Sequence, residues 1–344
     1  MRRPKPPLPD SPDVSLVLDY INAFRRSKTM FVATSLGVFD ELAGSSLTAG
    51  EIASRRNLNP DAVERLLNAC VSLGLLQKKG QVFKNNATAK KYLVSTSPDS
   101  LAGYIVYSEK TLFPLWRHLD GAVREGTNRW EQTFGSPTAL FDHFFRDETA
   151  KRSFLAGMHG LGRLTSGAVV RVFDLAAFRH MVDLGGATGH LAIAACEAYT
   201  SLRATVLDLH TVGDVARECI RQSVFADRVA FQAGDFFNDD LPPADLYAIG
   251  RILHDWDFEQ CQRLLTRIHQ ALPPGGALLI AETLLDDDHT GPRHALMQSL
   301  NMLVCTDGKE HSCSEYREMC LSAGFRSAEC GRTGTLLDAV LAIK

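Results

Sequence analysis

Short apolar runs alternate with amphipathic segments along the chain from about residue 173 onward. An apolar run of this kind is typical of a strand buried on both faces, so the alternation predicts a doubly wound α/β domain with a mainly parallel sheet. The segment from Phe258 to Leu272 has the helical period and ends at the Pro-Pro-Gly-Gly sequence of residues 273–276, which stops a helix. The predicted strands lie near residues 181–184, 204–208, 229–232, 245–249, 277–282 and 337–343.

The N-terminal part has a helical pattern instead. Apolar residues recur at steps of three and four from Leu16 to Leu36, which predicts an amphipathic helix. Thr48 and Glu51 have the spacing of a capping box at the start of a second helix. A third helix is predicted from Pro60 to Leu73, followed by a small hairpin that turns at Lys79–Gly80. This order of elements indicates a winged helix, which is all-helical apart from the hairpin.

A glycine-rich turn follows the first predicted strand of the α/β domain. Asp183 ends an apolar run, and Gly185, Gly186 and Gly189 precede an alanine-rich segment that predicts a helix. A strand, a glycine turn and a helix N-terminus can hold a nucleotide-sized ligand. A phosphate-binding P-loop would need Lys and Ser or Thr after the turn, where His190 and Leu191 stand, so a kinase or GTPase is excluded.

Two further acidic positions follow the next two strands. Asp208 ends a predicted strand about 20 residues after the turn, where related nucleotide folds place an acid on the ribose hydroxyls. The sequence Gly234-Asp235-Phe236 follows the third strand. Asp235 has the chemistry to accept from an adenine amino group, and Phe236 to pack on the base. Parallel strands of such a sheet bring these residues to one crevice at their carboxyl ends.

Together with Leu253-His254-Asp255-Trp256, these motifs resemble the class I S-adenosylmethionine-dependent O-methyltransferases of the caffeate/hydroxyindole type. The resemblance runs from about Ser15 to the C-terminus. It implies a Rossmann-like sheet, S-adenosylmethionine as the cofactor, and methyl transfer to the hydroxyl of a small aromatic substrate. That substrate would be a phenol or a hydroxyindole such as N-acetylserotonin. It also implies that the winged helix is a dimerisation domain, so a homodimer is expected.

The resemblance divides the chain into four parts. These are a proline-rich tail or linker at 1–12, a winged-helix dimerisation domain at 13–97, a helical linker and substrate-pocket segment at 98–172, and the cofactor-binding domain at 173–344. In the second of these, the predicted helix Pro60–Leu73 also allows a different hypothesis, a winged-helix regulator that senses a ligand. Its segment 61–69 carries Asp61 and Glu64 beside a single Arg, whereas DNA binding favours a basic face.

The resemblance also assigns roles at the cofactor. The Gly185 turn with Asp183 would hold the methionine end, Asp208 the ribose, and Gly234, Asp235 and Phe236 the adenine. Arg251 would lie near the cofactor, as would the aromatic Phe145 on the helical segment.

The chemistry requires a base, because the hydroxyl must lose its proton as the methyl group is transferred. By resemblance the base is His254, supported by Glu282 and Glu310. A carboxylate on one ring nitrogen fixes the tautomer and strengthens the base at the other. Asp255, Asn301, Cys305, Met158 and His159 are the expected substrate-side residues. No metal is expected; the acidic run at 286–288, which a metal-dependent catechol methyltransferase would use, is interpreted as a solvated loop.

Several positions depart from the family pattern. Ala187 replaces a glycine, which is tolerable if its φ is negative and strained otherwise. The aromatic pair that embraces the cofactor in hydroxyindole enzymes corresponds here to Phe145 and Gly162. Cys305 replaces a glutamine that helps to hold an acetamide, and a thiol cannot do the same. A catalytically weak or inactive paralogue that serves as an interaction module is therefore a further hypothesis.

Composition excludes other classes. The net charge of −3 gives no electrostatic footprint for nucleic acid or an anionic membrane. No apolar run approaches the length of a membrane span, and the N-terminus lacks a signal core, so a cytoplasmic protein without a membrane or nucleic-acid partner is expected. The 8 cysteines are scattered without a Cys-x-x-Cys pair, which favours free thiols over a disulfide framework or a zinc site.

Overall fold

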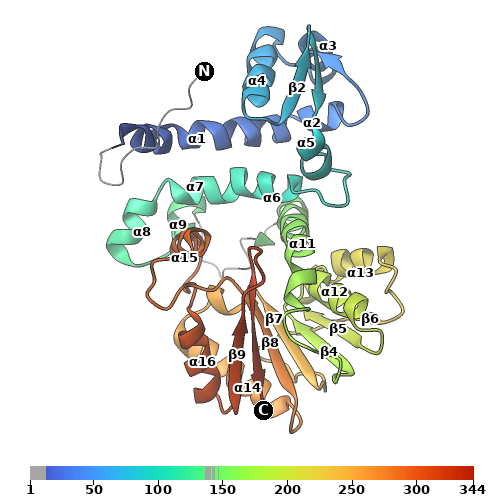
Figure 1. Ribbon diagram of the computed structural model, residues 1–344, viewed down its shortest axis with the longest axis vertical. Helices are drawn as coiled ribbons and strands as arrows, with labels where there is room; N and C mark the ends of the chain where they lie inside the picture. The colour runs from blue at the N-terminus through green and yellow to red at the C-terminus, as the bar shows by residue number, and fades with distance from the viewer. Residues whose placement is uncertain (1–12, 136–140, 142–143, 146) are drawn as a thin grey trace, which may run out of the picture. The chain divides into compact units, whose positions relative to one another are not determined.

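The computed structural model describes residues 13–135, 141, 144–145 and 147–344. The chain forms two compact units, Met1–Glu109 and Lys110–Lys344 (Figure 1). The predicted proline-rich tail at 1–12 lies outside the described residues. The boundary between the units falls inside the predicted 98–172 segment, and the finer division into 13–97, 98–172 and 173–344 stays a prediction.

The first unit is a winged helix. Its elements are α1 (Val14–Ser35), α2 (Val38–Glu41), β1 (Leu47–Thr48), α3 (Ala49–Arg56), α4 (Pro60–Ser72), β2 (Leu76–Lys79), β3 (Val82–Asn85), α5 (Ala87–Tyr92) and α6 (Ala102–Tyr107). The predicted hairpin is β2 and β3. The unit is less helical than expected, because Leu47 and Thr48 pair with Phe83 and Val82 and complete a three-stranded sheet in the order β1-β3-β2.

Local signals in the sequence explain where these helices begin. Thr48 accepts a hydrogen bond from Glu51 N at 3.2 Å and donates its own N–H to Glu51 at 2.7 Å, which is the predicted capping box. Asn59 caps α4 by accepting from Ala62 N at 3.0 Å, and Pro60 is the first residue of that helix. The apolar faces of these helices pack around Phe39, Ile52, Leu67 and Phe83, all at most 1% exposed.

The second unit is the predicted doubly wound domain. Before the sheet it has η1 (Ser108–Leu112, which spans the unit boundary), α7 (Phe113–Trp116), α8 (Leu119–Glu125), α9 (Trp130–Phe134) and α11 (Glu148–Val169). Then follow β4 (His180–Leu184), α12 (His190–Ala198), β5 (Arg203–Asp208), η2 (His210–Val212), α13 (Gly213–Gln222), β6 (Val229–Ala233), β7 (Leu246–Gly250), η3 (Leu253–Asp255), α14 (Phe258–Ala271), β8 (Ala277–Glu282), α15 (Arg293–Cys305), α16 (Cys313–Ser322), β9 (Ser327–Gly331) and β10 (Asp338–Ile343).

The sheet has the order β6-β5-β4-β7-β8-β10-β9. Strands β4 to β8 are parallel, whereas β10 is antiparallel to both β8 and β9. The chain moves outward from β4 to β6 and then returns to β7 beside β4. The strand order reverses there, and ligands of open α/β sheets bind in the crevice at the carboxyl ends of such strands.

Both faces of the sheet are buried, as the continuous apolar runs predicted. Along β4, Val182 and Leu184 belong to a core with α14 and α16, whereas Met181 packs with α12 on the other face. Figure 1 shows these helices on opposite sides of the sheet. The predicted strands are all present within two residues. Strand β9 was not predicted, because Ser327–Gly331 lacks an apolar run and lies at the edge of the sheet.

One cysteine pair differs from the prediction of free thiols. Cys313 at the start of α16 and Cys330 in β9 form a disulfide, with Cα atoms 6.0 Å apart and a sequence separation of 17. The packing of α16 on β9 brings them together, and no short motif signals this. The other six cysteines are free, and five of those are buried.

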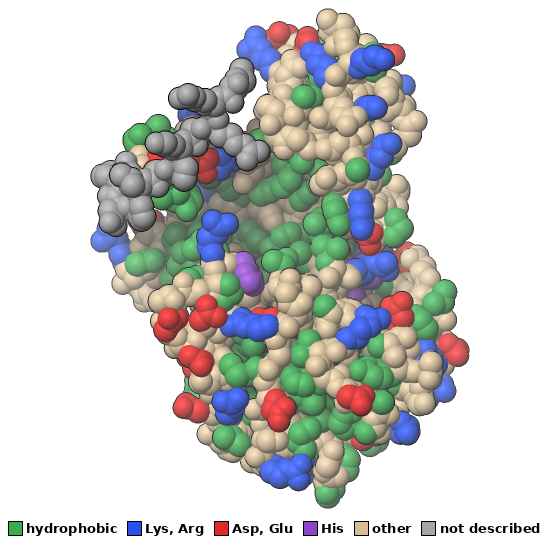
Figure 2. Space-filling view, in the orientation of Figure 1, with side chains coloured by type: hydrophobic (Ala, Val, Ile, Leu, Met, Phe, Trp, Pro, Cys, Tyr) green, Lys and Arg blue, Asp and Glu red, His purple; other side chains and the backbone are tan. Residues whose placement is uncertain are grey.

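No single sign of charge dominates the drawn face of the second unit. On the face drawn in Figure 2, basic and acidic side chains are interspersed over this unit. In α4 of the first unit, Arg65 pairs with Asp61 and Lys78 pairs with Glu64, so the segment proposed for DNA recognition has no net basic face. Across the described residues, no helix combines the length and apolarity needed to cross a membrane.

Candidate active site

The glycine turn, residues 185–189, joins β4 to α12 at the carboxyl edge of the sheet. Gly185 and Gly189 have φ values of 67° and 79°, which favour glycine. A Cβ on Gly185 would lie 2.5 Å from Cδ1 of Ile252 and 3.2 Å from Cε1 of Phe236. The turn therefore touches the segments that follow β7 and β6, and only glycine leaves them room.

Asp183 supports this turn from within the domain. Gly189, the N-cap of α12, has no side chain, and the backbone N–H of Ala192 in the first turn of that helix bonds to Asp183 instead. Oδ2 of Asp183 lies under Gly186, where a Cβ would come within 2.5 Å of it. Burial raises the pKa of Asp183 to about 7. Its role as a direct cofactor contact stays a prediction, since these contacts show it holding the turn.

Ala187, which replaces a glycine of the family pattern, adopts the strained positive φ. Its φ is +48°, in the left-handed region that costs an L-residue on the order of 1–2 kcal/mol. In this conformation its N–H donates to Oδ2 of Asp208 at 2.8 Å. The replacement of glycine is therefore accommodated at the expense of backbone strain in the turn itself.

Asp208 lies beside the turn at the end of β5. Oδ1 accepts from the N–H of Leu209 at 2.7 Å while Oδ2 accepts from Ala187. Burial raises the pKa of Asp208 to about 6, and these two N–H groups act in the opposite direction. Each carboxylate oxygen keeps a second lone pair, so Asp208 remains able to accept from the two hydroxyls of a ribose.

The Gly234-Asp235-Phe236 segment reaches the same place. Gly234 N donates to Asp208 O at 3.0 Å, and the Phe236 ring approaches Gly185. The carboxylate of Asp235 accepts from Phe237 N at 2.8 Å and from Nδ2 of Asn238 at 2.7 Å, which fixes its orientation.

Arg251 and Phe145 are also brought to the crevice. Arg251 follows β7 with a φ of +57°, and its N–H bonds to Ala281 O at 3.1 Å. Phe145 packs in a cluster that includes Ala187 of the turn and Phe154 of α11. Strained non-glycine residues cluster at functional sites, and Arg251 and Ala187 both border this crevice.

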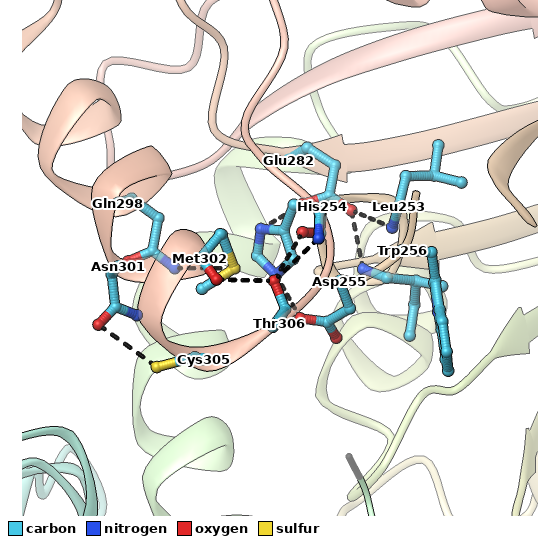
Figure 3. Close-up of polar contacts among 12 residues, drawn as sticks. Leu253, His254, Asp255, Trp256, Glu282, Gln298, Asn301, Met302, Cys305 and Thr306 are labelled. Atoms are coloured by element: carbon cyan, nitrogen blue, oxygen red, sulfur yellow. Dashed lines mark hydrogen bonds and ion pairs between the residues drawn. The ribbon is translucent and has the colours of Figure 1, made fainter. Parts of the chain in front are cut away.

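A second group of polar side chains, centred on His254, begins three residues after Arg251. His254, in η3, has Nδ1 at 2.7 Å from Oε1 of Glu310 and 3.2 Å from Oε2 of Glu282. His254 is 5% exposed and the two glutamates are 0% exposed. Nε2 faces the other way, 3.7 Å from Oδ1 of Asp255. The close-up in Figure 3 shows the His254 ring with Glu282 and Asp255.

Backbone contacts hold the histidine in place. Oε1 of Glu282 accepts from Ile252 N at 2.8 Å and from Leu253 N at 3.0 Å, so one carboxylate orients both η3 and the ring. The thiol of Cys261 donates to Leu253 O at 3.1 Å from below. Gly308 allows a close approach, because a Cβ there would lie 2.3 Å from His254 O.

The protonation of His254 is set by opposing effects. Burial lowers its pKa, but the carboxylates of Glu282 and Glu310 outweigh burial and raise the pKa of His254 to about 10. Burial likewise raises the pKa of Glu282 to about 7 and that of Asp255 to about 6. His254 with its carboxylates is therefore a strong base in a buried site, and these groups titrate as a unit.

Asn301 and Cys305 lie on α15 near the same histidine. Thr306, at the end of this helix, donates to Met302 O at 3.0 Å and lies 3.5 Å from His254 O (Figure 3). Oδ1 of Asn301 accepts from the indole N–H of Trp116 at 2.7 Å, and the Cys305 thiol is 3.7 Å away. An indole nitrogen only donates, so this bond fixes which end of the amide faces Trp116.

Comparisons with known proteins agree with this arrangement. The O-methyltransferase domain matches residues 116–326, and the O-methyltransferase dimerisation domain matches residues 18–95. The chain is 42% identical to acetylserotonin O-methyltransferase of Bos taurus, over 96% of this chain and 97% of that protein. A probable bifunctional dTTP/UTP pyrophosphatase/methyltransferase protein of Homo sapiens is 38% identical over 100% of this chain, which spans 55% of that protein. The crystal structure of human N-acetylserotonin methyltransferase in complex with SAM is 38% identical, with a TM-score of 0.92 over 98% of this chain and 99% of that one.

The chain belongs to the O-methyltransferase family. The predicted family, fold class and enzyme class are thereby confirmed, as is S-adenosylmethionine as the cofactor of the family. The individual site residues of this O-methyltransferase stay predictions. The structure brings Asp208, Asp235, Phe236, Arg251 and Phe145 to the crevice, and it places His254 between the two predicted glutamates.

Two residues of the O-methyltransferase site escaped prediction. Trp116 belongs to no recognised motif, but its indole N–H donates to Oδ1 of Asn301, 185 positions away in sequence. His190, noted only for excluding a P-loop, packs on α11 beside Gly162. His159, which is predicted to lie on the substrate side, has its Nδ1 2.8 Å from Oγ1 of Thr188 in the glycine turn, and its role toward the substrate stays a prediction. Met158, the other predicted wall residue on α11, is half-buried.

Each acid of the run at 286–288 has a partner in the protein. Asp286 pairs with Arg332 at 2.8 Å, Asp287 accepts from Ser314 N, and Asp288 accepts from Thr290 N. Across the described residues, the group that has a metal-binding spacing is instead His254, Glu282 and Glu310, with ligand atoms within 4.8 Å of one another. The expectation that the enzyme uses no metal stays a prediction.

The strain at Ala187 predicts a stabilising substitution. Ala187→Gly relieves the left-handed φ but adds backbone entropy to the unfolded chain, so a net gain of about 0.5–1 kcal/mol is expected. Urea unfolding measures it. Ala194→Gly, inside α12, is the matched control and should cost about 1 kcal/mol or more. Equal losses for both variants would show that Ala187 is not strained.

The raised pKa of His254 predicts the pH dependence of catalysis. Because the base must be deprotonated, kcat/KM should rise with pH from 7 toward about 10. Glu310→Gln removes a negative neighbour and lowers the pKa of His254, so the rising limb should move to lower pH by about one unit or more and its plateau should fall. Glu318→Gln, exposed on the same segment, is the control. A limb that stays in place in Glu310→Gln would contradict the assignment of His254 as the titrating base.

Proposed function

We propose that this chain is an S-adenosylmethionine-dependent O-methyltransferase that methylates the hydroxyl of a small hydroxyindole, with His254 as the general base. One observation carries the proposal: the buried His254 ring has Nδ1 against Glu310 and Glu282 and directs Nε2 away from them, in a crevice shared with the glycine turn. The complete set of base and supporting acids argues against the inactive-paralogue hypothesis.

The residues of the chain supply orientation and proton removal. When bound, S-adenosylmethionine supplies an electrophilic methyl group on a sulfonium. Glu310 accepts the Nδ1–H of His254, which leaves Nε2 as the nitrogen that takes the proton of the substrate hydroxyl. A phenolic hydroxyl has a pKa of about 10, close to that of His254, so the proton transfer is nearly balanced.

The cofactor is proposed to lie along the crevice at the ends of β4, β5 and β6. Asp208 would accept from the ribose hydroxyls, and Asp235 with Phe236 would bind the adenine. The glycine turn would receive the methionine end, with Arg251 and Phe145 bordering the site. Support comes from the convergence of these segments on Gly185 and Ala187.

Asn301 supports a substrate that carries a hydrogen-bond acceptor beside its aromatic ring. Trp116 and Cys305 both donate to Oδ1, so the amide nitrogen of Asn301 remains as the donor. No described residue forms a hydrogen bond with that nitrogen. An acetamide carbonyl fits this donor, whereas the thiol of Cys305 adds no second amide contact. Acetylserotonin O-methyltransferase relatives act on a substrate with such a group, as their name states.

Methyl transfer to matched acceptors tests this proposal. N-acetylserotonin should accept labelled methyl groups, and His254→Ala should lose about 100-fold or more in kcat. Trp116→Phe releases the Asn301 amide, so KM for N-acetylserotonin should rise about fivefold or more with kcat nearly unchanged. The control substrate 5-hydroxyindole lacks the acetamide and should show no KM change. No transfer to any hydroxyindole by the wild type would refute the proposed substrate class.

The first unit is proposed to form a homodimer. Seven large apolar side chains of α1 are 51% to 69% exposed, namely Val14, Leu16, Val17, Leu18, Tyr20, Ile21 and Phe24. Contiguous exposed apolar surface of this kind marks interaction sites. The match to a dimerisation domain over residues 18–95 includes most of this helix, and a second copy of the chain is its natural partner.

Charges placed on α1 should prevent this association. We expect a dimer at micromolar concentration in sedimentation analysis, and a folded monomer for the double variant Ile21→Asp, Phe24→Asp, because burying two carboxylates in an apolar interface is unfavourable. Val224 on the second unit is 86% exposed, so Val224→Asp is the control and should remain dimeric. A dimer that persists in the double variant would place the interface elsewhere.

A further inference from the structure

Two histidines flank the glycine turn and take no part in the proposed base chemistry. His159 lies on α11, and its Nδ1 is 2.8 Å from Oγ1 of Thr188 in the turn. His190 is the first residue of α12, directly after the turn, and its Nδ1 is 2.9 Å from Oγ of Ser166 on α11. Both rings are thus fixed between α11 and the turn by one nitrogen each.

The position of His190 depends on a glycine opposite it. A Cβ on Gly162 of α11 would lie 2.3 Å from Cγ of the His190 ring and 2.4 Å from Cδ2 and Cε1. Such distances are far inside van der Waals contact, so any side chain at position 162 would displace the imidazole. The missing side chain of Gly162 therefore leaves the space that the His190 ring occupies, so the position of the ring depends on this glycine.

Both imidazoles are neutral at physiological pH. Burial lowers the pKa of His159 to about 4, with Arg163 acting in the same direction. Burial also lowers the pKa of His190 to about 3, and His159 and Arg251 add to that effect. A neutral imidazole has one donor and one acceptor nitrogen. In the tautomer in which the hydroxyls of Thr188 and Ser166 donate to Nδ1, Nε2 of each ring is an N–H donor. No described residue hydrogen-bonds Nε2 of either ring.

We propose that His159 and His190 bind the carboxylate at the methionyl end of the cofactor. This inference rests on the proposed function, in which the glycine turn receives that end. Two N–H donors beside the N-terminus of α12 suit an anion, because the helix dipole and its free N–H groups add to the same attraction. Neutral donors bind the carboxylate without the cost of burying two cations. The carboxylate of Asp183 accepts from the N–H of Ala192, and its Oδ2, which has no hydrogen-bond partner among the described residues, lies under Gly186.

Two ligands that differ at the amino-acid end of the cofactor test whether the histidines bind its carboxylate. S-adenosylhomocysteine carries the amino-acid end, and 5′-methylthioadenosine is the same nucleoside thioether without it. Calorimetric titration into the full chain gives Kd for both. His190→Ala and His159→Ala should each weaken S-adenosylhomocysteine about tenfold or more and leave 5′-methylthioadenosine within about twofold, because a hydrogen bond to a charged group is lost.

Three more variants sharpen the test. Gly162→Ala keeps both imidazoles but displaces His190, and it should reproduce the His190→Ala selectivity. His159→Gln retains an N–H donor and should keep most of the affinity for S-adenosylhomocysteine. His180→Ala is the matched control, since His180 lies at the other end of β4 with both ring nitrogens engaged by Pro243 and Thr205. It should leave the ratio of the two Kd values unchanged.

The outcomes are distinguishable. Equal weakening of both ligands would mean that the histidines only hold the turn, which overturns the inference while the proposed cofactor stands. Unchanged binding of both ligands would also overturn it. A wild-type chain that binds neither ligand would refute the proposed cofactor, and the inference with it.

Discussion

The parallel pairing of β4 with β7 is the constraint on which the site depends. The register sets Leu184 beside Ile249, so both strands end at the same edge of the sheet. The segment after β4 is the glycine turn, and the segment after β7 carries Arg251 and His254. The glycine turn and the proposed base, which are distant in sequence, therefore become neighbours without any long loop. The contact between Gly185 and Ile252 shows how closely they approach.

Hydrogen-bond donors at that edge of the sheet offset the cost of burying the acidic side chains. Glu282 is fully buried, and its charge is met by two backbone N–H groups and by His254. A carboxylate buried without such partners would protonate instead of supporting a base. The position of η3, whose backbone N–H groups bond to Glu282, is thus needed to keep this carboxylate charged beside His254. The strained φ values of Ala187 and Arg251 show that the backbone on both sides of the crevice is held away from its local preference.

Much of this architecture follows from local pattern. Apolar runs located all six predicted strands, and Thr48 with Glu51 marked a helix start that the structure shows in full. The motif around His254 identified the base candidate and its two acids, which lie together as expected. The features that the sequence did not predict depend mostly on contacts between residues that are distant in sequence. Trp116 reaches Asn301 across 185 positions, Cys313 meets Cys330 only through packing of α16 on β9, and β9 has no apolar run to mark it. Nor does spacing reveal that Gly162 makes room for His190.

The place of β10 in the sheet has a consequence for biosynthesis. This strand, residues 338–343, lies between β8 and β9 and pairs Asp338 with Glu282. A ribosome makes β8 before β10, so the backbone N–H and C=O groups along one edge of β8 stay unpaired until residues 338–343 have been made. Exposed strand edges of this kind invite pairing with other chains. The strand that ends at Glu282 therefore gains its full set of backbone partners only after residue 343 has been made. Shorter translation products would expose this strand edge to other chains.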